Sequence, residues 1–103
     1  MDRNEAIREI KAALKRRSGR AWSVTGGRGT AWGWITIHAL PSRRVEPCDY
    51  MSDQDRTELA KLLALDRVDQ QGVSIAAADD FRREYVDRAN GRPPSVIGKP
   101  YWD

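Results

Sequence analysis

The spacing of hydrophobic positions predicts helices and strands in alternation along this chain. Ile7, Ile10 and Leu14 recur at intervals of three and four residues, which is typical of an amphipathic helix over residues 3–17. Gly19 follows, and glycine readily adopts the left-handed conformation that ends a helix. We therefore expect the chain to open with a helix that buries one apolar face.

In two segments after this helix, residues at alternate positions form two distinct sets, as on the two faces of a β-strand. The segments are residues 20–25 (RAWSVT) and 31–39 (AWGWITIHA), and the glycine-rich segment 26–29 separates them. Such an arrangement favours a β-hairpin, because glycine permits the positive φ of a tight turn. In the second strand, Trp32 and Trp34 would share the face opposite the isoleucines.

The second half begins with a polar linker and a further helix. Residues 41–49 are polar and contain two prolines, which is typical of a connection. Ser52, with Asp55 three residues later, resembles a capping box and indicates that a helix starts here. This helix would extend to about residue 65 and bury the stripe formed by Leu59, Leu62 and Leu63.

A short strand over residues 72–76 and a third helix complete the pattern. Asp79 or Asp80 would cap this helix, which runs to Ala89. The order α-β-β-α-β-α predicts an α+β fold, with helices on one face of a small, mainly antiparallel sheet. We expect one domain over residues 1–103 with an irregular tail from residue 92.

The composition narrows the class of protein without naming an activity. The chain has 103 residues, of which 40% are hydrophobic and 32% charged, enough apolar residues for a folded core. It contains no run of about 18 apolar residues that could span a membrane. Its first residues include no apolar signal-like stretch, and its single cysteine excludes an internal disulfide. A cytoplasmic protein that does not associate with membranes is expected.

Charge is distributed unevenly along the chain. The formal net charge is only +3, yet residues 1–44 carry ten basic and three acidic side chains. Residues 45–103 carry eight basic and twelve acidic ones. Clustered arginine is the usual footprint of phosphate contact, so the basic half is a candidate for binding a polyanion. Alternatively, the acidic half pairs with the basic half, or meets a basic partner.

The candidate nucleic-acid-binding residues combine basic side chains with aromatic rings. The basic set is Lys15, Arg16, Arg17, Arg20, Arg28, Arg43 and Arg44, and the aromatic set is Trp32 and Trp34. Exposed indoles could stack on bases while arginines hold phosphates. In the structural alternative, the rings pack in or on the core and the cations satisfy helix ends or remain solvated.

The glycine-rich segment TGGRGT at residues 25–30 is a weaker candidate. Backbone amides of such loops can cradle phosphate, and Arg28 would add a charged contact. However, the segment lies between two strands and contains neither a P-loop nor a dinucleotide-binding motif. A hairpin tip without ligand is the simpler interpretation.

Catalysis and metal binding have little support in the sequence. His38 and Cys48 are the only residues of their types, and no further group completes a catalytic or zinc-binding set. Asp79 and Asp80 are better explained as helix-capping residues. We therefore expect a non-enzymatic protein with no cofactor and no metal.

Residues 6–37 resemble one known family. The segment AIREIKAALKRRSGRAWSVTGGRGTAWGWITI is similar to the helix and hairpin that open the large polyvalent protein-associated domain 29 of phages and conjugative elements. Trp32 and Trp34 depart from the small polar residues expected in its second strand, and the chain after residue 40 has no counterpart. The resemblance implies a mobile-element or anti-defence setting, and it transfers no site residues.

Two functions follow as hypotheses. The favoured one is a binding protein whose basic, Arg- and Trp-bearing first half contacts nucleic acid or a nucleoprotein complex. The alternative is an interaction module that docks on a host protein through exposed aromatics or through the tail, where Tyr101 and Trp102 would be the anchors. The oligomeric state does not follow from the sequence.

Overall fold

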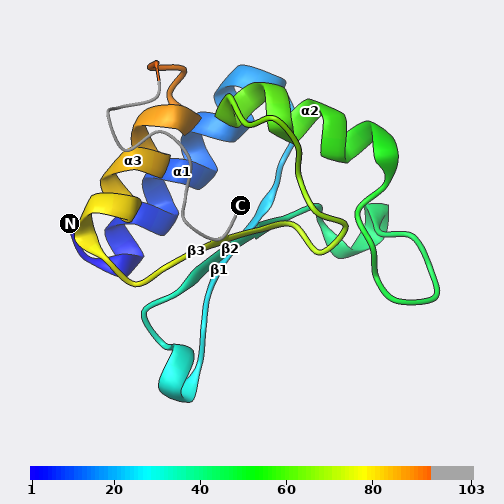
Figure 1. Ribbon diagram of the computed structural model, residues 1–103. Helices are drawn as coiled ribbons and strands as arrows, with labels where there is room; N and C mark the ends of the chain where they lie inside the picture. The colour runs from blue at the N-terminus through cyan, green and yellow to red at the C-terminus, as the bar shows by residue number, and fades with distance from the viewer. Residues whose placement is uncertain (94–103) are drawn as a thin grey trace.

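The computed structural model describes residues 1–93, which form a three-stranded antiparallel sheet with three helices packed on one face (Figure 1). The order α-β-β-α-β-α confirms the predicted α+β class. The elements are α1 (Arg3–Ser18), β1 (Ser23–Gly26), the 3₁₀ turn η1 (Gly29–Ala31), β2 (Ile35–His38), the 3₁₀ turn η2 (Pro41–Arg43), α2 (Asp53–Leu63), β3 (Val73–Ile75) and α3 (Asp79–Ala89). The tail from residue 94 onward lies outside the described residues.

The helix α1 forms where the sequence predicts it and for the expected reasons. Asp2 is the N-cap residue, and its carboxylate accepts a hydrogen bond of 2.8 Å from the Glu5 amide. Gly19 ends the helix with a φ of 74°. The buried face consists of Ala6, Ile10, Ala13 and Leu14. The opposite face of α1 is therefore left to solvent.

The sheet has one apolar and one polar face. β2 is central and pairs antiparallel with β1 and with β3. Val24 lies opposite Ile37, which in turn lies opposite Val73, so that the helices cover a continuous row of buried β-branched side chains. The other face carries the polar row Thr25, Thr36 and Ser74.

The second strand is shorter than predicted. β2 begins at Ile35, because η1 and the turn that follows it at residues 32–33 replace extended backbone. The Trp32 amide donates to the Gly29 carbonyl at 3.1 Å and thereby closes this turn. The prediction that Trp32 and Trp34 share one strand face is wrong, since both precede the strand and Trp32 lies in the turn.

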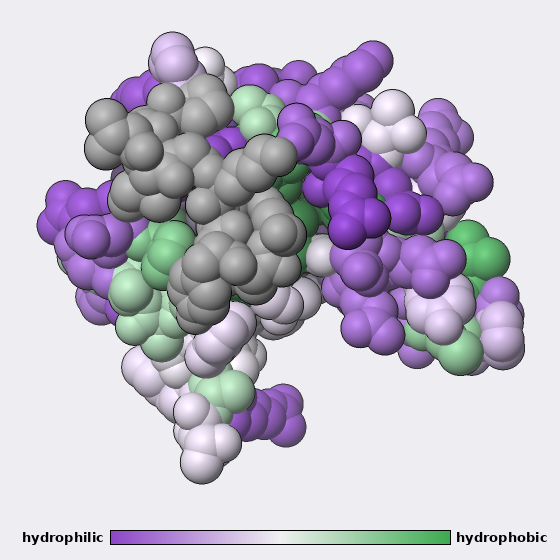
Figure 2. Space-filling view, in the orientation of Figure 1, coloured by the Kyte–Doolittle hydropathy of each residue, from purple (hydrophilic) through white to green (hydrophobic). Residues whose placement is uncertain are grey.

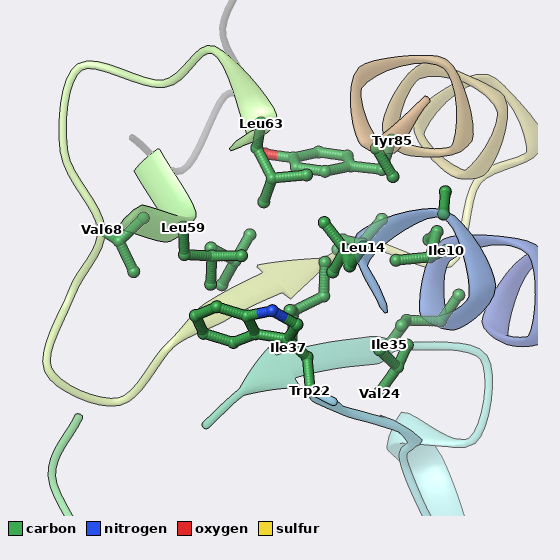
Figure 3. Packing of buried hydrophobic residues seen from close by; sticks show 14 of the residues in the cluster. Ile10, Leu14, Trp22, Val24, Ile35, Ile37, Leu59, Leu63, Val68 and Tyr85 are labelled. Carbon is green, nitrogen blue, oxygen red and sulfur yellow. The ribbon is translucent and has the colours of Figure 1, made fainter. Parts of the chain in front are cut away.

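The core brings all three helices onto the apolar face of the sheet (Figure 3). Trp22, Leu14, Leu59 and Tyr85 are each at most 1% exposed. Burying one large apolar side chain contributes about 1.5–3 kcal/mol. The Trp22 indole N–H donates to the Ser18 hydroxyl at 3.0 Å, so its polar atom is also satisfied.

One of the two predicted helix caps in the second half is confirmed. The Ser52 hydroxyl accepts a hydrogen bond from the Asp55 amide at 3.2 Å and caps α2. The expected capping of α3 by Asp79 or Asp80 is wrong, because Ala78 occupies the N-cap position without a side-chain bond. The Asp79 carboxylate instead binds the terminal amine of Met1, and also Arg83 at 2.6 Å.

Candidate nucleic-acid interface

Two of the predicted phosphate-binding arginines pair with carboxylates of α2. Arg20 donates to Asp55 at 2.7 Å and also binds Glu58, and Arg43 contacts the same Asp55 at 3.2 Å. Their guanidinium carbons lie 5.3 and 4.9 Å from the centroid of the Trp22 ring. The hydrogen bonds that Arg20 donates to Asp55, and then to Glu58, raise the pKa of Arg20 above its ordinary value. The later carboxylates thus neutralise these two cations.

Three further arginines bind the ends of secondary-structure elements. Arg17 donates to the Leu62 carbonyl of α2 at 2.9 Å and to the Ala89 carbonyl of α3 at 2.8 Å. Arg16 donates to the Asn90 side chain at 2.7 Å. Arg44 donates to the Ala39 carbonyl at 2.9 Å. The contacts of Arg17 correspond to the structural alternative, in which basic side chains satisfy the last carbonyls of helices.

The outer face of α1 carries basic side chains without such partners. Lys15 is exposed, and so are Arg8 and Lys11, which precede it on the same face at intervals of three and four. Within residues 1–93, none of the three forms an ion pair or a side-chain hydrogen bond. We call Arg8, Lys11 and Lys15 the α1 basic row.

Sequence reasoning named only the last member of this row. It selected cations that are adjacent in the chain, such as Lys15 and Arg16, whereas a helix brings together residues three and four apart. The same spacing that identified the apolar face of α1 identifies Arg8 and Lys11 on its polar face. The signal was therefore present in the sequence.

The β1–β2 hairpin ends in an ordered tip, residues 27–34, which projects away from the helices (Figure 1). Arg3 of α1 fastens this tip: it donates to the Gly27 carbonyl at 3.1 Å and to the Trp32 carbonyl at 2.8 Å. Its guanidinium also stacks on the Trp32 ring, 3.8 Å from the centroid. Sequence reasoning missed Arg3, because its contacts span more than 20 positions.

Three exposed side chains, Arg28, Trp32 and Trp34, lie at this tip. Arg28 is exposed and forms no ion pair within the described part of the chain. Trp32 is 55% exposed and Trp34 37%, whereas Trp22 is 1% exposed. Two of the three tryptophans of the first half therefore reach the surface, together with one arginine. Figure 2 shows the tip as the lower protrusion, with a hydrophilic projection beside paler residues.

Some backbone amides of the hairpin tip are engaged in the turn. The Gly27 amide donates to the Trp34 carbonyl at 2.8 Å, and those of Ala31 and Trp32 close η1 at 3.0 and 3.1 Å. Amides committed in this way are not available to cradle a phosphate. Of the glycine-rich segment, residues 25–30, Gly27 alone donates in this way outside the strand pairing, and Arg28 adds an exposed cation.

The two residues considered for catalysis or metal binding are His38 and Cys48. His38 is 9% exposed, and its Nδ1 has no hydrogen-bond partner there. Burial, with Arg44 as a further cause, lowers the pKa of His38. Cys48 is exposed. Residues 1–93 bring no three His, Cys, Asp or Glu side chains together as a metal site, and none of their helices could cross a membrane.

The proposed partner-binding anchors Tyr101 and Trp102 lie outside the described residues. Comparison with known proteins finds no matching family model, no similar curated protein and no similar solved structure. The resemblance of residues 6–37 to the polyvalent-protein domain consequently remains an expectation.

Proposed function

We propose that this protein binds nucleic acid, without catalysing a reaction on it, through a surface formed by the α1 basic row and the hairpin tip. The supporting observation is the division of the first-half cations into two sets. Arg20 and Arg43 are neutralised by Asp55 and Glu58, whereas Arg28 and the α1 basic row form no ion pair with a carboxylate within residues 1–93.

The two parts of this surface border each other along α1. Arg3 and Ser18 lie on the edge of the helix that faces the hairpin, because they bond to Trp32 and Trp22 respectively. At about 100° per residue, the three side chains of the α1 basic row lie about 20–140° around the helix axis from these two residues. The row therefore flanks the side of α1 to which the hairpin is attached.

The dimensions suit a phosphate backbone. Arg8 and Lys15 are seven residues apart, which corresponds to about 10 Å of helix. Along the axis of a DNA duplex each strand carries one phosphate per about 3.4 Å, so this length corresponds to about three phosphates of one strand. The cations of the row can thus contact neighbouring phosphates of one strand, and Arg28 can add a contact beyond the end of the helix.

The uneven distribution of charge along the sequence supports a net positive potential at α1. Most carboxylates of α2 and α3 are engaged with arginines, as in Asp55 with Arg20 and Glu84 with Arg88. They are then less able to offset the field of α1. Unpaired surface cations attract a polyanion and release its counterions on binding.

A charge-matched pair of double variants tests the proposal. Lys11→Gln with Lys15→Gln removes two charges from the α1 basic row, and Lys61→Gln with Arg67→Gln removes two exposed charges elsewhere. Fluorescence anisotropy would measure binding to labelled oligonucleotides of about 16 nucleotides. The salt concentration would be varied between about 50 and 200 mM.

We expect the first variant to weaken binding and to reduce the slope of log K against log salt by about 1.4–1.8, since each lost phosphate contact removes about 0.7–0.9. The matched variant should retain most of the affinity and of the slope. Absence of binding by the wild type at low salt would contradict the proposal and direct attention to the protein-docking alternative. Equal effects of both variants would show that net charge, not this surface, is responsible.

A further inference from the structure

We propose that Trp32 is a stacking platform for an unpaired nucleobase, so that the preferred ligand is single-stranded nucleic acid. This inference rests on the proposed function and adds a class of ligand to it. It depends on the relation of Trp32 to Arg3 and Arg28, and not on the α1 basic row.

The Trp32 ring has one occupied face and substantial remaining exposure. The guanidinium of Arg3 lies 3.8 Å from the ring centroid and covers one face. The residue as a whole is nevertheless 55% exposed, more than any other tryptophan of the described residues. The face opposite Arg3 is therefore where a flat partner can lie against the indole.

The ring is already ordered before any ligand arrives. Arg3 bonds to the carbonyls of Gly27 and Trp32, and the Trp32 amide bonds to the Gly29 carbonyl at 3.1 Å. Both sides of the Trp32 peptide unit are thus fixed to the turn. A preordered aromatic side chain loses little conformational entropy when a ligand stacks on it, which favours binding.

A phosphate contact lies next to this platform. The Arg28 carbonyl accepts a hydrogen bond from the Ala31 amide at 3.0 Å, so Arg28 and Trp32 flank the same closed turn. The Arg28 side chain is exposed and unpaired within residues 1–93. A nucleotide whose base stacks on Trp32 can therefore place its phosphate near a guanidinium. This pairing of an aromatic face with a cation is common in single-strand binding surfaces.

Single strands fit this site better than duplexes do. In a duplex both faces of each base are covered by its neighbours, so an indole reaches them only by unstacking a step, which costs free energy. An unpaired base can expose a face without this cost. Stacking is also tolerant of sequence, because every base has a flat aromatic face.

The test compares three labelled ligands on the full chain: an oligothymidylate of about 16 nucleotides, an abasic oligomer with the same number of phosphates, and a duplex of equal length. Stacking predicts that the wild type binds the thymidylate about tenfold or more tighter than the abasic oligomer. Trp32→Leu should lose this ratio, Trp32→Phe should retain most of it, and abasic binding should change little in both variants.

The outcomes distinguish failure of the stacking proposal from failure of the proposed function. A thymidylate-to-abasic ratio near one in the wild type overturns the stacking proposal, whatever the variants do, and so does a preference for the duplex. If the α1 row variant still weakens binding to all three ligands in that case, the proposed function stands without the inference. If the wild type binds none of the three, both fail. Thermal melts of the variants show whether Trp32→Leu is folded, and the wild-type ratio decides the question where it is not.

Discussion

The guanidinium of Arg3 lies 3.8 Å from the centroid of the Trp32 ring and donates to the carbonyl of the same residue at 2.8 Å. The first turn of α1 is thereby fastened to the tip of a hairpin more than 20 positions away. The contact links the two parts of the proposed binding surface, because the basic row begins on the next turn of the helix.

Replacing Arg3 with Ala should lower the free energy of unfolding by about 1–2 kcal/mol, since it removes two charge-assisted hydrogen bonds and a stacked cation, all partly exposed. Arg8→Ala is the control and should change stability by less than about 0.5 kcal/mol, because Arg8 is exposed. Urea denaturation checks both values. Hydrogen exchange should show faster exchange of the Trp32 amide in the Arg3 variant only. Equal stability of the two variants would contradict the fastening role.

Two glycines of the tip, Gly27 and Gly29, are required for different reasons. A Cβ on Gly27 would lie 1.9 Å from the Ala31 carbonyl oxygen, whereas one on Gly29 would meet no atom within 4 Å. Gly29 has a φ of 58°, which costs an ordinary residue about 1 kcal/mol. Gly27→Ala should therefore destabilise the protein more than Gly29→Ala does. Thermal unfolding of both variants measures the difference, and a milder effect at Gly27 would show that the turn adapts.

Local signals predicted the elements of the fold well. Gly19 ends α1 and Ser52 caps α2 as expected, because both act on neighbouring backbone groups. The start of β2 was not predictable from alternation alone. Large and small residues still alternate through residues 31–34, but the turn that begins with η1 uses amides that a strand would need. Turn chemistry outweighed the period-two pattern there.

The candidate site depended on contacts between distant parts of the chain. The sequence shows how many charges each half carries, but not that Arg20 meets Asp55, which lies 35 positions later. Arg20 and Arg28 lie at opposite ends of β1. The fold therefore brings Arg20, but not Arg28, to the carboxylates of α2. Arg8 and Lys11, by contrast, could be recognised from helical spacing, which needs no tertiary information.

Asp55 binds both arginines of the cluster formed by Arg20, Arg43, Asp55 and Glu58. Its side chain is 4% exposed and serves both Arg20 and Arg43. Asp55→Ala should reduce the free energy of unfolding by about 2–3 kcal/mol, less than for a fully buried pair because both arginines keep some access to water. Asp53→Ala, two residues earlier in the same turn and with a fully exposed side chain, should cost less than about 1 kcal/mol through the helix dipole. Chemical denaturation of both variants would test this ranking, and a reversal would contradict the role of the cluster.

The buried His38 predicts that the stability of the protein falls as the pH is lowered below the ordinary histidine pKa of 6.5. Burial is the main cause that lowers its pKa below the ordinary value of 6.5, and Arg44 acts in the same direction while Asp49 opposes it. Below pH 6.5 the unfolded chain therefore takes up the proton first, and the free energy of unfolding falls as the pH is lowered towards the folded-state pKa. His38 is the only histidine, so His38→Gln should flatten this dependence, which urea denaturation at a series of pH values would measure. Asp79, whose pKa is lowered by the terminal amine and by Arg83, loses its contribution only below its ordinary value of 3.8 and does not interfere. An unchanged slope in His38→Gln would assign the pH dependence to another group.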